Sequence, residues 1–296
     1  MSYYRALENS CISYTTNINT SKLSSIRAGG YADCIISPVT EDELILTLRL
    51  LRAEGARYKV IGGCTNTFFS DEGYRGAIVS TRKLRKISFE KDSVLAQSGA
   101  VLSSLISAAA DMSASLCSEL FGIPGTVGGA VRNNAGAYGR DVSDILLTAE
   151  LYDTEDEKII HLDRSDMKFS YRDSLIRHSG LILLSARLAL RYKTKEEIRA
   201  DMLRSIERRR ASQPLQPSLG SFFKRHMGSP VSKIIDELGM KGMRVGGASI
   251  SEKHAGFIVN SDNATACDIC ELADRVEKIV FAERGITLQR EAEYVQ

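Results

Sequence analysis

Two glycine-rich segments are the parts of this 296-residue sequence whose composition best suits binding chemistry. The first, residues 61–66 (Ile-Gly-Gly-Cys-Thr-Asn), follows a short apolar run that we predict to be a buried strand. Glycines remove side chains, so backbone N–H groups can approach an anion closely, and Thr65 and Asn66 add polar contacts. The segment matches neither the dinucleotide fingerprint G-x-G-x-x-G nor a P-loop, so alone it suits a tight turn nearly as well.

The second segment, residues 122–139, is more specific, because six of its eighteen residues are glycine. Each ordered glycine costs about 0.5–1 kcal/mol relative to alanine, so this density is unfavourable for packing alone. It indicates a ligand lying against the backbone. Pro124 and the small residues after it predict a helix N-terminus directed at a phosphate group.

The elements that position these segments follow from the apolar periodicity. We expect helices at 41–54 and 102–111, and strands at 32–39, 58–61, 77–80, 87–90, 94–97, 145–152, 158–162 and 181–190. A long charged helix at 194–210 ends at Ser212-Gln213-Pro214, which is the best domain boundary in the sequence.

A smaller α+β unit is expected beyond that boundary. It begins with a strand near 221–224 and a helix that has Ser229 as its N-cap and Pro230 as its first residue. A strand at 256–260, a helix near 265–284 stopped by Gly285, and a closing strand at 286–295 complete the chain.

Composition limits the possible partners and compartment. Lys and Arg (39) nearly balance Asp and Glu (37), so charge gives no reason to expect a nucleic-acid or membrane partner. The N-terminus lacks a hydrophobic signal core and no apolar run is long enough to span a membrane, so we expect a cytoplasmic protein. Cys267 and Cys270 form a C-x-x-C on a predicted helix, where we interpret them as packing residues and expect no metal site.

Several motifs, in order from about residue 17 to 293, resemble the UDP-N-acetylenolpyruvoylglucosamine reductase family. They are residues 61–66, 70–73 (Ser-Asp-Glu-Gly), 122–139, 171–174 (Tyr-Arg-Asp-Ser), 220–224 (Gly-Ser-Phe-Phe-Lys) and 251–257 (Ser-Glu-Lys-His-Ala-Gly-Phe). The short stretch between the 171–174 and 220–224 motifs is similar to the compact type of the family, which lacks an inserted substrate loop.

This resemblance implies an α+β fold with two domains. The FAD-binding region, of the vanillyl-alcohol-oxidase/PCMH type, would span 1–205 with subdomains at about 1–75 and 76–205, and a smaller substrate-binding domain would span 206–296. The implied reaction reduces UDP-N-acetylglucosamine enolpyruvate to UDP-N-acetylmuramate through FAD and NADPH, in peptidoglycan precursor synthesis. We expect a monomer that binds this small-molecule substrate.

Site residues are carried over by motif. The FAD-binding set, with main-chain amides favoured over side chains, is Ile61, Gly62, Gly63, Cys64, Thr65, Asn66, Gly122, Pro124, Gly125, Thr126, Gly128, Gly129, Asn134, Gly136, Ala137 and Tyr138. The substrate-binding set is Tyr171, Lys224, Arg225 and His254. Arg225 stands where the family pattern usually has asparagine, and Cys64 where it usually has glycine, so we expect the local substrate pose and flavin turn to differ.

The resemblance assigns catalysis to three residues. Hydride addition to C3 of the enolpyruvyl group leaves negative charge at C2 and on the adjoining carboxylate, which Arg172 can bind through two N–H groups. Glu291 matches the family's carboxyl group that stabilises the enolic intermediate, and Ser221 matches its proton donor to C2.

Two alternatives remain open. One is another FAD-dependent oxidoreductase of the same superfamily, such as an oxygen-using oxidase, although those chains are usually longer. The other is a non-catalytic nucleotide-binding protein, which would be expected to have lost at least one of the three catalytic residues.

Overall fold

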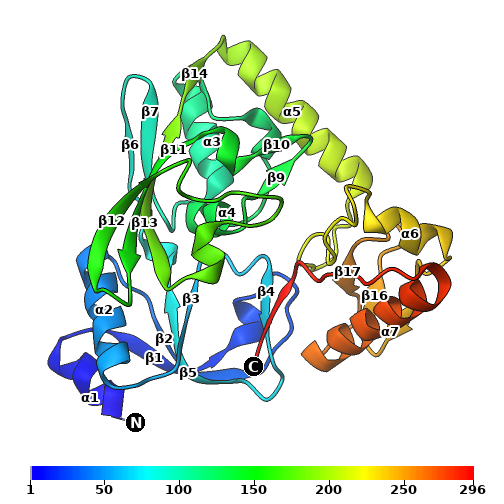
Figure 1. Ribbon diagram of the computed structural model, residues 1–296, viewed down its shortest axis with the longest axis horizontal. Helices are drawn as coiled ribbons and strands as arrows, with labels where there is room; N and C mark the ends of the chain where they lie inside the picture. Colours follow the sequence, from blue (N-terminus) through cyan, green and yellow to red (C-terminus); the bar gives the residue numbers. More distant parts are fainter. Residues whose placement is uncertain (1) are drawn as a thin grey trace. The chain divides into compact units, whose positions relative to one another are not determined.

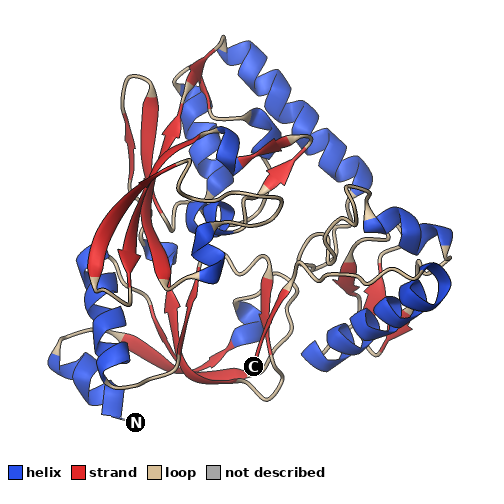
Figure 2. Ribbon diagram, in the orientation of Figure 1, coloured by secondary structure: helices blue, strands red, loops and turns tan. Residues whose placement is uncertain are grey.

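Helices are interspersed with runs of strands along residues 2–296, the part of the chain that the computed structural model describes (Figure 2). These residues divide into two compact units. The larger unit contains residues 2–16, 34–63 and 76–208, and the smaller unit contains residues 17–33, 64–75 and 209–296. Both units mix helices with strands (Figure 1), so the predicted α+β class is confirmed.

One part of the larger unit is built on a four-stranded sheet of order β1-β2-β5-β3, although residues 17–19, 31–33 and 74–75 of its strands belong to the smaller unit. Its elements are α1 (Ser2–Asn9), β1 (Tyr14–Asn19), β2 (Tyr31–Ile36), α2 (Glu41–Ala53), β3 (Tyr58–Ile61) and β5 (Tyr74–Ser80). Helix α2 begins at its N-cap Thr40 and buries Leu44, Leu48 and Leu51 along one face. Because β3 and β5 are parallel neighbours, the loops that follow them emerge at the same edge of the sheet.

The other part of the larger unit is a five-stranded antiparallel sheet of order β12-β11-β13-β7-β6. Its strands are β6 (Ile87–Phe89), β7 (Ser93–Gln97), β11 (Leu146–Asp153), β12 (Lys158–Asp163) and β13 (Leu181–Ala189). Helices α3 (Leu102–Asp111) and α4 (Val127–Arg132) share a buried core with this sheet. Short pairs join β8 (Ala114–Ser115) to β14 (Arg191–Tyr192) and β9 (Gly136–Ala137) to β10 (Arg140–Asp141), and α5 (Lys195–Ser212) follows.

The smaller unit packs α7 (Ala266–Arg284) against the antiparallel strands β15 (Arg244–Val245), β16 (Ala248–Ile250) and β17 (Ile258–Asn260). Helix α6 (Val231–Glu237) contacts α7. The last strand, β18 (Glu293–Val295), pairs in parallel with β4 (Thr67–Phe69), so the end of the chain is held by the segment 64–75. None of the helices in residues 2–296 has the length and apolar character that a membrane span requires.

The 70–73 motif connects distant segments of the smaller unit. The Asp71 carboxylate accepts hydrogen bonds from the N–H groups of Ala266 and Cys267, both at 2.8 Å, and so satisfies two donors in the first turn of α7. Gly73 has a φ of 91°, and a Cβ there would lie 2.0 Å from the Tyr31 carbonyl oxygen. Both residues therefore act in folding, since they join distant segments of the chain.

Three expectations for the C-terminal region are wrong. Residues 221–224 form no strand; they make only an isolated bridge from Phe223 to Arg290, because their N–H groups donate to two different neighbours. The closing strand is limited to Glu293–Val295. Helix α6 begins at Val231 with Pro230 as the N-cap, because Pro230 is extended (φ −64°, ψ 122°).

Candidate functional site

A pocket of ≈ 370 Å³ lies within the larger unit, between the carboxyl end of β3, helix α4 and the start of β13. It is lined by residues 58–62, Thr81, Ser98, Gly128, Gly129, Arg132, Thr154, Ile176, Arg177 and 179–183. Four of the predicted FAD-binding residues, Ile61, Gly62, Gly128 and Gly129, are among them. Both glycine-rich segments therefore contribute to one cavity.

The backbone at these glycines packs at very short range. A Cβ on Gly62 would lie 2.3 Å from Oγ1 of Thr126, so the loop after β3 touches the N-cap of α4. A Cβ on Gly128 would lie 3.0 Å from the carbonyl oxygen of Ser98. Gly129 differs, because outside its own helix the nearest atom to its Cβ would be Thr126 Oγ1 at 3.8 Å. The space beside Gly129 is therefore open on the pocket side.

Ser98 provides an independent sign of a ligand. Ser98 is one of the residues that line the pocket, and its buried Oγ has no hydrogen-bond partner within residues 2–296. A buried hydroxyl left unpaired costs about 1–3 kcal/mol. A pocket that combines exposed glycine backbone with an unsatisfied hydroxyl fits the FAD group expected from the sequence, since FAD offers polar groups along its whole length.

The N-terminus of α4 does not present free donors, contrary to the expectation from Pro124. The N–H of Val127 donates to the Ala100 carbonyl at 2.8 Å and the N–H of Gly128 to the Ser98 carbonyl at 2.7 Å, while that of Gly129 donates to the N-cap Thr126. The helix anchors the loop after β7 instead. By contrast, the N–H groups of Gly62 and Gly63 have no protein partner in the described part of the chain.

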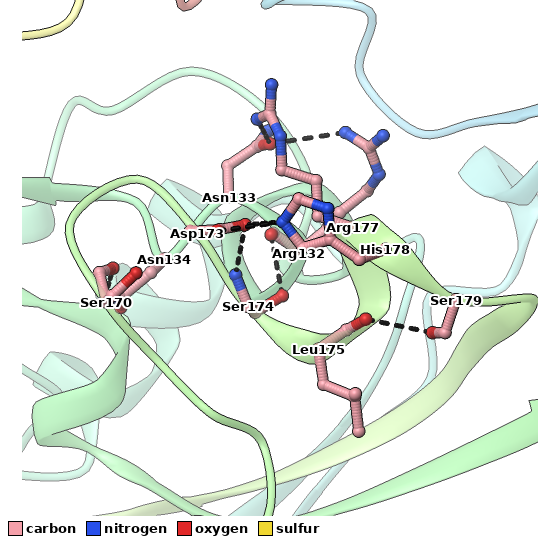
Figure 3. A network of polar contacts seen from close by, with 10 residues as sticks. All are labelled: Arg132, Asn133, Asn134, Ser170, Asp173, Ser174, Leu175, Arg177, His178 and Ser179. Atoms are coloured by element: carbon pink, nitrogen blue, oxygen red, sulfur yellow. Dashed lines mark hydrogen bonds and ion pairs between the residues drawn. The ribbon is translucent and has the colours of Figure 1, made fainter.

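Two arginines form a polar wall that the sequence analysis did not select. Arg132 and Arg177 line the pocket, and each donates from Nη1 to Oδ1 of Asn133, at 3.3 and 2.9 Å (Figure 3). Two guanidinium groups at one wall favour an anionic ligand. The available signal was that Arg132 lies within the 122–139 motif and Arg177 lies three residues after the 171–174 motif.

The 171–174 motif holds the C-terminal end of helix α4, where Arg132 lies. The Asp173 carboxylate lies 2.7 Å from Nε2 of His178 and accepts the N–H of Ser174 at 3.0 Å (Figure 3). The hydroxyl of Ser174 donates to the Arg132 carbonyl at 2.7 Å. Two of the four motif residues therefore have a structural role.

Arg172 is fixed against the second glycine segment. Its Nη1 donates to the carbonyl of Asn134 at 3.2 Å and to Oδ1 of Asp141 at 3.3 Å, and its Nη2 donates to the carbonyl of Gly136 at 2.6 Å. Its guanidinium also lies 5.0 Å from the ring centroid of the exposed Tyr171. The structure thus brings a predicted catalytic residue to predicted cofactor-binding residues.

The remaining residues of the second glycine segment lie at the antiparallel pair β9–β10 or in the loop before α4. Tyr138, at the β9–β10 turn, has a φ of 54° and its ring faces the guanidinium of Arg208 at 5.5 Å. Gly122, Pro124 and Gly125 belong to the loop before α4. They are not among the described residues that line the pocket.

The smaller unit brings together the other motif segments around Phe222. The N–H of Phe222 donates to the Gly256 carbonyl, and the N–H of Glu291 donates to the Phe222 carbonyl, both at 2.8 Å. The side-chain amide of Asn66 donates to the Glu291 carbonyl at 2.9 Å. The segments of Ser221, His254 and Glu291 are therefore neighbours, with Ser221 exposed and Glu291 half-buried.

The ring of His254 is oriented by a backbone hydrogen bond. The N–H of Gly256 donates to its Nδ1 at 3.1 Å, so the neutral ring carries its proton on Nε2. The pKa of His254 is lowered from 6.5; burial is the largest cause, and the nearby charge of Lys241 acts in the same direction.

Lys224 and Arg225 lead into a tight turn. The N–H of Lys224 donates to the Gln289 carbonyl at 2.8 Å, and the turn is closed by a bridge between His226 and Ser229. Lys224 is half-buried and Arg225 is exposed. Both basic residues follow Ser221 within four residues of the chain.

Comparisons with known proteins cover nearly the whole chain. Residues 32–163 match the FAD binding domain model, and residues 213–295 match the model of the UDP-N-acetylenolpyruvoylglucosamine reductase C-terminal domain. The UDP-N-acetylenolpyruvoylglucosamine reductase of Caldicellulosiruptor saccharolyticus is 39% identical over 300 residues, which is 100% of this chain and 96% of the relative. That of Clostridioides difficile is 39% identical over 269 residues, 90% of this chain and 88% of the relative.

Solved structures give the same result. The crystal structure of the reductase from Thermus caldophilus superposes with a TM-score of 0.82 at 30% identity, over 96% of this chain and 99% of that one. A glucose dehydrogenase, Phl p 4, shares the fold alone, with a TM-score of 0.51 at 17% identity over 66% of this chain and 45% of that one.

Proposed function

The chain belongs to the UDP-N-acetylenolpyruvoylglucosamine reductase family, and on that premise we propose which of its residues carry the reaction. It is a flavin oxidoreductase of peptidoglycan precursor synthesis, which reduces UDP-N-acetylglucosamine enolpyruvate to UDP-N-acetylmuramate with FAD as cofactor and NADPH as reductant. When bound, FAD would supply the hydride-transfer chemistry that links NADPH to C3 of the enolpyruvyl group.

FAD is held in the pocket of the larger unit. Gly129 leaves room for it, Gly62 offers its backbone N–H, Ser98 offers its unsatisfied hydroxyl, and the guanidinium groups of Arg132 and Arg177 complement its anionic diphosphate. The remaining residues assigned by motif supply further contacts, with their backbone rather than their side chains.

Three side chains act on the substrate. Arg172, whose guanidinium is positioned by two carbonyls and Asp141, binds the enolpyruvyl carboxylate. Glu291 stabilises the enolic intermediate, and Ser221 gives its Oγ proton to C2. The resulting alkoxide of Ser221 is stabilised by cations such as Lys224 in the same segment.

The observation that carries this assignment is the hydrogen-bond pattern at Phe222. Its N–H and carbonyl link the Ser221 segment to the His254 and Glu291 segments, which lie far apart in the sequence. Tyr171, Lys224, Arg225 and His254 bind the substrate, and the neutral Nε2–H of His254 donates to a phosphate oxygen.

Stopped-flow absorbance of the two half-reactions tests the role of Ser221. Ser221→Ala should reduce its flavin with NADPH at the wild-type rate but reoxidise with substrate on the order of 10²-fold more slowly, because only the second half needs a proton donor. Ser229→Ala, a matched exposed serine eight residues away, should leave both halves unchanged. If Ser221→Ala slows both halves equally, the proton comes from another group.

Domain roles and cellular setting complete the proposal. Residues 1–205 form the FAD-binding region and 206–296 the substrate-binding domain, a boundary close to the last passage of the chain out of the larger unit at 208/209. The protein works as a cytoplasmic monomer without nucleic-acid or membrane partners. A single monomer mass in light scattering of the flavin-loaded protein would support this, and a dimer mass would contradict it.

A further inference from the structure

Arg82 makes a forked contact with the backbone of the first glycine segment. Its Nε donates to the carbonyl of Gly62 at 3.0 Å, and its Nη2 donates to the carbonyl of Gly63 at 2.7 Å. The contact arises from topology, because Arg82 follows β5 and Gly62 follows β3, and these parallel strands end at the same edge of the sheet.

The neighbouring Thr81 extends this contact by one residue. Its hydroxyl donates to the Ile61 carbonyl at 3.3 Å, so the carbonyls of Ile61, Gly62 and Gly63 are all held by residues 81 and 82. No peptide bond in residues 2–296 is cis. In a trans peptide the carbonyl and the following N–H point in opposite directions. The N–H groups of Gly62 and Gly63 are therefore directed away from Thr81 Oγ1 and Arg82.

These two N–H groups have no partner within the described residues, and Gly62 lines the pocket. Successive unpaired backbone donors form an anion-binding concavity. At the other glycine segment, the first amides of α4 are consumed by protein acceptors. The loop at 62–63 is thus the backbone donor set best suited to an anion in this pocket.

We propose that Arg82 is a positioning residue for the FAD diphosphate. In this role it acts through the carbonyls of Gly62 and Gly63. Its fork fixes the peptide planes that follow Gly62 and Gly63, and Thr81 fixes the plane that precedes Gly62. The N–H groups of Gly63 and Gly62 are thereby preorganised by Arg82 and Thr81, respectively, before the diphosphate arrives. This inference rests on the proposed FAD site in the larger unit, and it adds a residue that no glycine or motif pattern would select.

The test measures FAD affinity of the apoprotein by quenching of flavin fluorescence. Arg82→Gln should weaken FAD binding by about tenfold, equivalent to ~1.4 kcal/mol. Arg82→Lys keeps the charge but loses the fork, so it should recover little of that loss. Arg85→Gln is the matched control: it removes the same charge from an exposed arginine three residues away and should bind FAD like the wild type.

Phosphorus NMR of the FAD-loaded proteins separates positioning from a general effect on folding. The diphosphate resonances of bound FAD should move in Arg82→Gln and stay in place in Arg85→Gln, while the thermal midpoint of both apoproteins stays equal. Equal FAD affinity in the two glutamine variants, or full recovery by Arg82→Lys, would overturn the positioning role. A wild-type apoprotein that binds no FAD would instead refute the proposed cofactor site.

Discussion

Gly128 and Gly129 are adjacent in α4 and both line the pocket, yet the structure predicts different consequences for a side chain at each. A Cβ on Gly128 would press on the carbonyl oxygen of Ser98 at 3.0 Å and on its Cβ at 3.1 Å. At Gly129 the nearest protein atom outside the helix would be 3.8 Å away. A side chain at 128 therefore collides with protein, and a side chain at 129 collides only with what occupies the pocket.

The magnitudes follow from these distances. Overpacking of a tight site costs about 1–3 kcal/mol. In Gly129→Val this cost falls on the FAD complex and should raise the FAD dissociation constant by roughly 5- to 150-fold. The Gly129→Val apoprotein should be as stable as the wild type, because glycine is a poorer helix former than valine. In Gly128→Val the same cost should also lower the free energy of unfolding of the apoprotein.

Two measurements on the apoproteins distinguish these outcomes. Thermal unfolding should show a midpoint lowered by several degrees for Gly128→Val, at about 2–4 °C per kcal/mol for a protein of roughly this size, and an unchanged or higher midpoint for Gly129→Val. Fluorescence titration should show weakened FAD binding for both. Wild-type FAD affinity in Gly129→Val would mean that the cofactor does not lie against α4, and the assignment of this pocket would be refuted.

Three further predictions concern other contacts. Asp71→Ala should destabilise the protein by about 1–2 kcal/mol, because two first-turn donors of α7 lose their acceptor; chemical denaturation with Glu72→Ala as control measures this, and equal values would refute it. Asp141→Asn should raise the substrate KM up to about fivefold by loosening Arg172, without changing flavin reduction by NADPH; a slower reduction would show a role in flavin binding instead. Burial lowers the folded-state pKa of His254; Lys241 also lowers this pKa, and Asp236 raises it. The contribution of His254 to stability is therefore complete above pH 6.5 and is lost as the pH falls below that value. His254→Asn should flatten this part of the profile of stability against pH, and an unchanged slope would assign the pH dependence to other groups.

Local periodicity was sufficient for the elements that carry the site. The predicted strand at 58–61 and helix at 102–111 coincide with β3 and α3, because apolar spacing and a nearby glycine or polar residue define such elements within a few residues of chain. The motifs in order were likewise sufficient for the family, since motif order does not depend on how the chain folds. The α+β class followed from both.

Pairing between distant segments decided what the sequence could not. Residues 221–224 look like a strand, but their N–H groups donate to two different partners, so no ladder forms. Asp71 belongs to the 70–73 motif, and only the fold shows that it caps a helix that begins 195 residues later in the chain. Amide donors also depend on tertiary contacts: those of α4 are consumed by the loop after β7, whereas those of Gly62 and Gly63 stay available. The tertiary structure alone determines this difference, because a glycine-rich sequence specifies where a backbone is bare and the surrounding fold specifies which way its hydrogen-bond donors point.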